Sequence, residues 1–382
     1  MPQRRLHEAP CSRYEVVVLR SLRLRNFRGF REFRMAGLGR VNLLVGTNNC
    51  GKTSVLEAIQ ILAAPGAPWP LWETLVRRGE TREGGDEREV EVAHIVHGHQ
   101  MDAEASFSVA GTNDGDERNV KATFRERMAR LTRKTTRQVE LFETDSDDER
   151  ELAPLELLIE WQSGEQHRSL EWPLTRRGGL LRDLLSTEVR RATAELSPVH
   201  FITTEGLTRD KVVALFDETV LTPDESTVLQ ALRTIDPSIE RVASVGTSRR
   251  YVFGARGGIV MLAEGKRLPI GSMGDGIWRL LGIALALVRA RGGTLLVDEI
   301  DTGLHYTVLV DMWRLVLDTA RRLEVQVFAT THSRDCYEAL AATATEGGYD
   351  ISLQRIERGR DLAVAFTESE IRQAADRGIE VR

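Results

Sequence analysis

Residues 46–53 read Gly-Thr-Asn-Asn-Cys-Gly-Lys-Thr and fit the eight-position pattern G-x-x-x-x-G-K-[ST]. An apolar, strand-like run over residues 41–45 precedes them, and a helix-like run from 54 to 64 follows until Pro65. Glycines let the backbone N–H groups of such a loop point inward, and the start of the helix adds partial positive charge. This strand, loop and helix therefore predict a site that captures the phosphates of a nucleotide.

The residues of this loop have separate expected tasks. We expect Lys52 to contact the β- and γ-phosphates and the Thr53 hydroxyl to ligate Mg²⁺. The residues expected to bind the nucleotide are Asn48, Asn49, Cys50, Gly51, Lys52, Thr53 and Ser54. A chance glycine-rich turn is the alternative, and the flanking strand and helix favour the nucleotide site over it.

The composition describes a soluble chain with room for a large core. Its 382 residues, 41% hydrophobic and 29% charged, are enough for two domains or for one domain with a large insertion. The net charge of −5 argues against a general nucleic-acid binder. No apolar run approaches the roughly 18 residues of a membrane span, and the N-terminus has no apolar segment typical of a signal peptide. The three cysteines form neither a disulfide framework nor a metal-binding spacing, so we expect a cytoplasmic protein without a membrane partner.

Two further predicted strands are apolar and end in side chains that can bind a metal or take part in catalysis. Residues 294–299 read Thr-Leu-Leu-Val-Asp-Glu, and ligands of open α/β sheets bind at the carboxyl ends of strands. Asp298 is therefore placed to hold Mg²⁺, and Glu299 to orient or deprotonate the attacking water. A helix-capping aspartate is the plainer alternative. The second strand, residues 325–329, leads to His332. Because this strand is expected in the same sheet as the phosphate loop, His332 can reach a γ-phosphate there, although a lone histidine is more often structural.

A second glycine-rich segment, Gly-Ser-Met-Gly-Asp-Gly at residues 271–276, precedes the apolar helix predicted for residues 277–289. Glycines and a serine at a helix start form an anion site. Because the chain already has a phosphate loop, this second site is expected to serve the nucleotide of another subunit. Asp301, in the turn after the acidic pair, is expected to serve communication between subunits. Ordinary helix-terminal residues are the alternative for both segments.

The function of the two basic segments remains open at this level. Residues 14–33 alternate apolar residues with arginines, which indicates a half-buried strand whose arginines either face solvent or contact phosphates. A basic run from Arg125 to Arg137 precedes an acidic run at 143–151, and these form either a solvated loop or an arm that grips nucleic acid or a partner subunit. Hairpins are predicted at 155–174, turning at Ser163-Gly164, and at 251–269, turning at Gly257-Gly258.

Taken together, these motifs resemble the ABC-type ATPase head, and more closely its OLD and RecF-like branch, which includes SMC-type repair ATPases. The resemblance covers about residues 14–64 and 198–345. Residues 24–30 (Leu-Arg-Asn-Phe-Arg-Gly-Phe) look like the opening strand of that branch, residues 46–53 match Walker A, and residues 295–299 match Walker B. Asp301 matches the D-loop position and His332 the switch histidine, and Gln100 is the Q-loop candidate. The signature position is occupied by Ser272, Met273, Gly274 and Asp275, which depart from the usual Ser-Gly-Gly-Gln.

The fold implied by this resemblance is an α/β, ABC-type P-loop ATPase head with a mixed sheet. It would have a β-rich and helical insertion between Walker A and the signature motif. The expected parts are residues 1–65 with Walker A, an inserted region at 66–197 that serves as an arm or binds a partner, and residues 198–382 with the remaining motifs. Two heads would meet head to tail as a homodimer or higher homo-oligomer, with Ser272, Met273 and Gly274 of one chain facing the ATP and Mg²⁺ held by the other.

The resemblance also implies a partner. Full-length OLD proteins carry a Toprim nuclease domain after the ATPase, but only 50 residues follow His332 here, fewer than the roughly 100 of a typical domain. We therefore expect a stand-alone ATPase that controls a separate effector, such as a Toprim-like nuclease, as in two-gene anti-phage defence systems of the PARIS and Septu kind. DNA or a phage-derived molecule is the expected trigger. A RecF- or SMC-like DNA-repair ATPase is the alternative. A transporter ATPase fits the variant signature less well, and Glu299 argues against a module that never hydrolyses its nucleotide.

Overall fold

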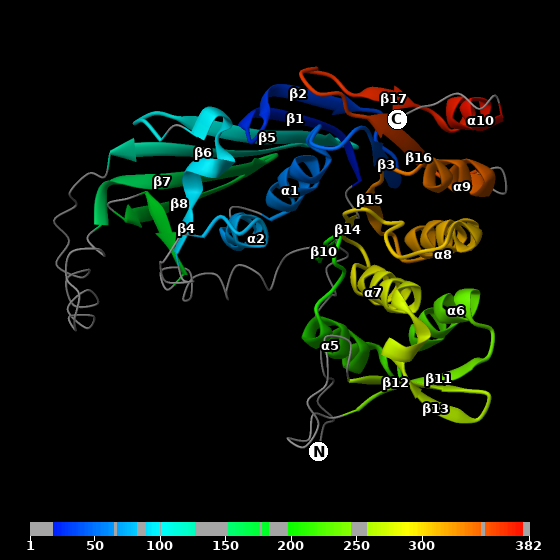
Figure 1. The fold of residues 1–382 in the computed structure, drawn as a ribbon. Helices are drawn as coiled ribbons and strands as arrows, with labels where there is room; N and C mark the ends of the chain where they lie inside the picture. Colours follow the sequence, from blue (N-terminus) through cyan, green and yellow to red (C-terminus); the bar gives the residue numbers. More distant parts are fainter. Residues whose placement is uncertain are drawn as a thin grey trace, which may run out of the picture.

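The computed structural model describes residues 18–64, 67–81, 89–99, 101–126, 152–175, 178–182, 198–245, 258–344 and 348–376. Two six-stranded sheets dominate the molecule, and a three-stranded sheet lies at its far end (Figure 1). The prediction of an α/β fold with a mixed sheet is confirmed.

The core sheet carries the predicted motifs. Its strands, in spatial order, are β10 (Val199–Ile202), β14 (Thr294–Val297), β15 (Gln326–Thr330), β3 (Val41–Val45), β16 (Ile351–Arg355) and β17 (Val364–Phe366). All neighbours pair in parallel except β16 and β17. β3 and β15 are buried along their whole length, as expected of strands covered on both faces. The register aligns Ile202, Val297 and Ala329, so these strands end at one edge of the sheet.

The second large sheet is antiparallel and unites the N-terminus with the predicted insertion. Its strands, in spatial order, are β2 (Phe30–Ala36), β1 (Leu19–Phe27), β5 (Ser106–Asn113), β6 (Glu117–Glu126), β7 (Leu152–Ser163) and β8 (Gln166–Thr175). Four of these strands come from residues 66–197, and β5 pairs directly with β1. The division into residues 1–65, 66–197 and 198–382 stays a prediction, since this sheet joins residues from the first two parts.

Helix α1 (Lys52–Leu62) lies between the two large sheets and contacts both β5 and β14 (Figure 1). Leu44 of β3 belongs to the hydrophobic cluster on the α1 side, whereas Leu43 belongs to the cluster on the opposite face. That opposite face is covered by α7 (Asp275–Arg289), α8 (Leu309–Arg322) and α9 (Arg334–Ala344). Helix α10 (Glu368–Asp376) packs on α9, and α2 (Trp69–Arg77) packs on α1.

A small lobe packs on the side of α7 that faces away from the core sheet. Helices α5 (Arg209–Thr219) and α6 (Glu225–Ile235) contact α7, and both contact β11 of a three-stranded sheet. That sheet consists of β11 (Ile239–Ser244), β12 (Ile259–Ala263) and β13 (Lys266–Pro269). A short strand pair, β4 (Glu89–Glu91) with β9 (Gly179–Leu181), and two 3-10 turns, η1 (Val92–Ile95) and η2 (His97–His99), complete the region near α2.

Some local predictions are confirmed and others are wrong. The hairpin of β7 and β8 turns after Ser163 as predicted. In the hairpin predicted for 251–269, residues 251–257 lie outside the described part of the chain. The prediction for the described part, a strand after the turn, is wrong, because β12 and β13 reverse at Glu264-Gly265. The run predicted as one strand from 14 to 33 contains two strands, because left-handed backbone at Asn26 and Arg28 reverses the chain.

The basic segments are only partly described by the structure. Arg23, Arg25, Arg31 and Arg34 are exposed, whereas Arg28 is buried. Arg125 pairs with Glu156 and Glu171, and most of the basic and acidic runs after it, like Gln100, lies outside the described residues. Every helix that the structure describes is too short or too polar to span a bilayer.

Candidate functional site

The phosphate loop joins β3 to α1 and depends on two glycines. Gly46 and Gly51 have φ values of 146° and 102°, in the left-handed region that glycine favours. A methyl group added at Gly46 would lie 2.3 Å from the carbonyl oxygen of Ile356, and one added at Gly51 would lie 2.3 Å from Cζ of Phe30. The loop can therefore run this close to its neighbours only with glycine at both positions.

The side chains of the loop divide between its surface and its interior. Asn48 and Asn49 are exposed, whereas Cys50 and Ser54 are buried. The Lys52 ammonium donates to the carbonyl oxygens of Gly46 (2.8 Å) and Thr47 (3.0 Å). These two bonds use two of its three donor hydrogens and hold the cation against the loop.

Asp298 connects three elements at the carboxyl edge of the core sheet. The Thr53 hydroxyl, in the first turn of α1, donates to Asp298 Oδ2 at 2.9 Å. The Thr330 hydroxyl, at the end of β15, donates to Asp298 Oδ1 at 2.6 Å. A hydroxyl and a carboxylate are hard oxygen ligands of the kind that Mg²⁺ prefers. The structure thus brings together the two residues predicted to hold the metal, and their chemistry fits that ion.

Glu299 and His332 also lie together at this edge. Glu299 has a φ of 49°, an uncommon left-handed conformation for a residue with a side chain. Its backbone N–H donates to the Thr330 hydroxyl at 2.8 Å, which fixes the turn that follows β14. His332 Nδ1 lies 3.4 Å from Glu299 Oε1. At this separation the carboxylate and the imidazole are close enough to contact the same water molecule.

The predicted signature residues lie in a different part of the molecule. Ser272 and Met273 belong to the 3-10 turn η6 (Ile270–Met273), which packs against β12, β13 and α7 (Figure 1). Gly274, with a φ of 90°, precedes α7. Ser272 is exposed, and its hydroxyl donates to the carbonyl oxygen of Pro269 at 2.7 Å. Within one chain, the packing and hydrogen bonds described for these residues thus involve η6, β12, β13 and α7, and not Lys52, Thr53 or Asp298.

The turn that carries Asp301 contacts the start of α7. Asp301 Oδ1 accepts a hydrogen bond from the Thr331 hydroxyl at 2.7 Å. A methyl group added at Gly276 would lie 3.1 Å from the carbonyl oxygen of Gly303. The turn after Walker B is thus anchored at one end to β15 and packed at the other against the helix that follows the signature segment.

Arg279 is a residue of this region that the sequence reasoning missed. It lies on α7 and is buried, and its guanidinium donates to the backbone carbonyls of Asp298 (2.7 Å) and Glu299 (2.8 Å). It also donates to the carbonyls of Thr203 (2.6 Å) and Thr204 (3.4 Å), just after β10. Burial lowers the pKa of Arg279 to about 10, against the opposing effect of nearby carboxylates, so the side chain is still charged at neutral pH. The available signal was an arginine near the start of an otherwise apolar helix.

Comparisons with known proteins match the two motif-bearing parts of the chain. A family model described as "AAA ATPase domain" matches residues 18–104, which contain the phosphate loop. A model described as "AAA domain, putative AbiEii toxin, Type IV TA system" matches residues 262–335, which contain the signature segment, Asp298, Glu299 and His332.

Curated relatives show more distant similarity. An ATP/GTP phosphatase of Helicobacter pylori is 21% identical over 343 residues, covering 85% of this chain and 87% of the relative. An uncharacterised protein of Methanocaldococcus jannaschii is 32% identical over 60 residues, and the DNA replication and repair protein RecF of Clostridioides difficile is 47% identical over 45 residues. The chain spans only 27% and 12% of the lengths of these two relatives.

Among solved structures, an SMC head bound to the C-winged helix domain of ScpA has a TM-score of 0.48 at 12% identity, covering 92% of this chain and 98% of that chain. The SMC head domain from Thermotoga maritima has a TM-score of 0.42 at 11% identity, covering 91% and 98%.

The sequence matches give the class that the chain resembles: residues 18–104 and 262–335 are similar to AAA-type ATPase domains, and one 45-residue segment is similar to RecF. The narrower assignment to the OLD family stays a prediction.

Proposed function

We propose that this protein is an ATPase whose two copies close head to tail on ATP, and that this closure controls a separate effector, such as a nuclease, in anti-phage defence. The proposal is carried by one observation: Lys52, Thr53, Asp298, Glu299 and His332 converge at one edge of the core sheet, while the signature segment is exposed elsewhere. A second copy can then supply Ser272, Met273 and Gly274 to complete the site, with Asp301 in the same interface.

Each residue has a task in this scheme. Lys52 leaves the loop carbonyls for the β- and γ-phosphates, whose charge it balances. Backbone N–H groups from Asn48 to Ser54 surround the phosphates. Thr53 and Asp298 would hold Mg²⁺, which supplies charge neutralisation for phosphoryl transfer. Glu299 accepts a proton from, or orients, the attacking water, and His332 contacts the γ-phosphate.

Binding across two chains also explains why ATP would act as a switch. A ligand that binds only the closed dimer stabilises that dimer by mass action, and hydrolysis removes the stabilisation. An effector that binds one of the two states would therefore be held or released according to the nucleotide.

The decisive experiment compares two variants of the full chain with Mg²⁺-ATP, measuring phosphate release and molar mass by light scattering. Glu299→Gln keeps the shape but loses the proton acceptor, so hydrolysis should fall about 10²- to 10⁴-fold and an ATP-dependent dimer should accumulate. Lys52→Ala should bind no ATP and remain as it is without nucleotide. Hydrolysis by Glu299→Gln at the wild-type rate would contradict the role of Glu299. If wild type and both variants have the same mass with ATP, the head-to-tail closure is wrong.

A RecF- or SMC-like role in DNA repair is the second candidate, favoured by the RecF similarity. The two candidates differ in their response to nucleic acid. A repair ATPase should hydrolyse ATP faster when linear DNA is added, whereas a defence ATPase should respond to its effector or trigger. Phosphate release measured with and without linear DNA separates them.

A further inference from the structure

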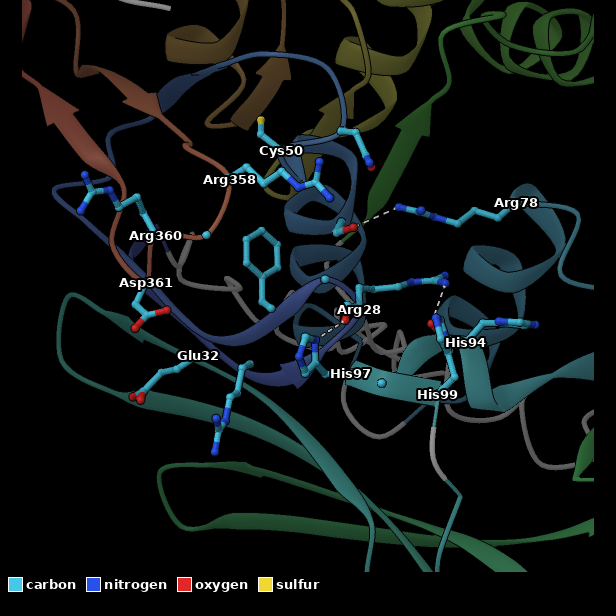
Figure 2. A pocket seen from close by; sticks show the side chains of 18 of the residues that line it. Arg28, Glu32, Cys50, Arg78, His94, His97, His99, Arg358, Arg360 and Asp361 are labelled. Atoms are coloured by element: carbon cyan, nitrogen blue, oxygen red, sulfur yellow. Dashed lines mark hydrogen bonds between the residues drawn. The ribbon is translucent and has the colours of Figure 1, made fainter.

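A cavity of about 570 Å³ lies beside the phosphate loop (Figure 2). The residues that line it include Phe30, Cys50, His97 and His99. None of the residues predicted to hold Mg²⁺ or to act on the attacking water is among the described residues that line it. A ligand in this cavity therefore does not hold those side chains in place, and contacts within the protein have to do so. The end of β15 provides several of these contacts.

Thr330, the last residue of β15, holds the turn that follows β14. Its hydroxyl donates to Asp298 Oδ1 at 2.6 Å and accepts from the Glu299 N–H at 2.8 Å, and its carbonyl oxygen accepts from the Ile300 N–H at 3.0 Å. The residue is fully buried, so water cannot easily replace these bonds. Because the hydroxyl has only one hydrogen and uses it on Oδ1, the other oxygen of Asp298 stays with Thr53.

Thr331, the next residue, holds a different segment. Its backbone N–H donates to the carbonyl oxygen of Leu44 in β3 at 3.1 Å, and its hydroxyl donates to Asp301 Oδ1 at 2.7 Å. The hydroxyl also accepts from the Ser333 N–H at 2.9 Å. This residue is fully buried as well. Thr331 therefore connects the strand before the phosphate loop with the turn that carries Asp301, the residue expected to serve communication between subunits.

His332 lies between the two ends of this arrangement. Its Nδ1 atom is 3.4 Å from Glu299 Oε1, and in the proposed function its ring contacts the γ-phosphate. In the chain it follows Thr331 and precedes Ser333, whose N–H is bonded to the Thr331 hydroxyl. A movement of His332 toward the phosphate would therefore shift this hydroxyl, and with it Asp301. Thr330 bonds to other carboxylate and backbone groups, so the two threonines can be altered separately.

We propose that Thr330 and Thr331 are positioning residues with separate tasks. Thr330 holds the acidic pair in place for hydrolysis. Thr331 transmits the contact between His332 and the γ-phosphate to Asp301, so that ATP bound to one chain strengthens the contact with the second chain. This inference rests on the proposed function, because it assumes both hydrolysis and head-to-tail closure.

The test replaces each threonine by valine, which keeps the branched shape but has no hydroxyl. Phosphate release by the full chain would be measured over a range of protein, ATP and Mg²⁺ concentrations, and molar mass by light scattering. Thr330→Val should lower kcat about 10²-fold, as expected when reacting groups are displaced. It should also need more Mg²⁺ for half-maximal hydrolysis, while the ATP-dependent dimer still forms.

Thr331→Val should have the opposite pattern. Its ATP-dependent dimer should be about tenfold weaker, in the range of typical coupling between two sites. Its kcat should return to near the wild-type value at protein concentrations that saturate the dimer, because the acidic pair keeps its contacts with Thr330. No increase in protein concentration should restore the kcat of Thr330→Val.

Further variants show whether each hydroxyl acts through its carboxylate. Thr330→Ser and Thr331→Ser restore the donor and should recover most of the lost function. Asp301→Asn combined with Thr331→Val should dimerise no more weakly than Asp301→Asn alone, because the threonine acts through that aspartate. The matched control is Thr343→Val in α9, a buried threonine whose hydroxyl donates to the Ala339 carbonyl oxygen at 2.8 Å, and it should change neither kcat nor dimerisation.

Equal changes of kcat and dimerisation in the two valine variants would overturn the inference, because the threonines would then act only on the stability of the fold. Serine variants as impaired as the valine variants would also overturn it, as would additive losses in the double variant with Asp301→Asn. If the wild type neither hydrolyses ATP nor changes its mass with ATP, the proposed function itself fails, and this inference fails with it.

Discussion

Arg279 holds the backbone at the ends of the Walker B strand and of its neighbour β10 through one guanidinium. Its donors reach carbonyls after β10 and after β14 at the same time. Since two strand ends depend on one planar group with several donors, a lysine cannot replace it, because an ammonium has fewer donors and a different reach.

We therefore expect Arg279→Lys to lower the free energy of unfolding by about 1–3 kcal/mol, as buried carbonyls lose their donors. It should also lower kcat for ATP hydrolysis more than it changes KM, because Asp298 and Glu299 lose their support. Urea unfolding and steady-state kinetics measure the two effects. Arg289→Lys, in the last turn of the same helix and largely exposed in a pair with Glu218, is the control and should change little. An unchanged kcat would show that the carbonyl contacts of Arg279 do not position the acidic pair.

At the scale of elements, the turn at 301–304 and the start of α7 form one unit. The close approach of Gly276 to the Gly303 carbonyl joins the Asp301 turn to the helix that follows the signature segment. In the proposed dimer, both segments face the second copy, so a shift of one would move the other. A methyl group added at Gly276 would lie closer to the Gly303 carbonyl oxygen than an ordinary van der Waals contact. Either the turn or the helix would therefore have to shift.

Gly276→Ala should weaken ATP-dependent dimerisation and hydrolysis several-fold, because the new methyl group displaces the Gly303 carbonyl. The control is Gly282→Ala in the same helix, where the nearest atoms to an added methyl group are 3.8 Å away. That change should be neutral or stabilise by about 0.5–1 kcal/mol, since alanine favours a helix over glycine. Sedimentation in the presence of ATP measures dimerisation, and phosphate release measures hydrolysis. Equal behaviour of the two variants would contradict a functional link between the turn and the helix.

At the scale of the whole molecule, stability should depend on pH through His200 of β10. Burial lowers the pKa of His200, and Arg289 and Lys211 act in the same direction, whereas a backbone hydrogen bond and Glu218 oppose them. The unfolded chain therefore takes up a proton at a higher pH than the folded chain. Stability is then fully present above the ordinary histidine pKa of about 6.5 and decreases as the pH falls below it.

His200→Gln removes this titration, so its melting temperature should fall less than that of the wild type between neutral pH and mildly acidic pH. Thermal unfolding followed by circular dichroism at several pH values provides the comparison. His167→Ala, on an exposed surface, should keep the wild-type slope. An identical pH slope in wild type and His200→Gln would exclude His200 as a source of acid sensitivity.

The core strands were the most predictable part of the fold. β3 coincides with the predicted run from 41 to 45, and β14 and β15 lie within a residue or two of their predicted ranges. These strands are buried on both faces, so burial alone imposes a continuous apolar run with polar residues at its end. The prediction for 251–269 missed the reversal at Glu264-Gly265, because glycines at both 258 and 265 permit a turn and only packing chooses between them.

By itself, the sequence determined the phosphate loop, the acidic pair and the parallel strands that carry them, because each depends on residues adjacent in the chain. Only the tertiary structure joined β1 to β5 across the predicted insertion, placed Arg279 on the backbone of the acidic pair, and formed the cavity that Phe30, His97 and His99 line. These features depend on contacts between residues far apart in the chain. Side-chain packing selects those contacts, and a local sequence pattern does not specify that packing.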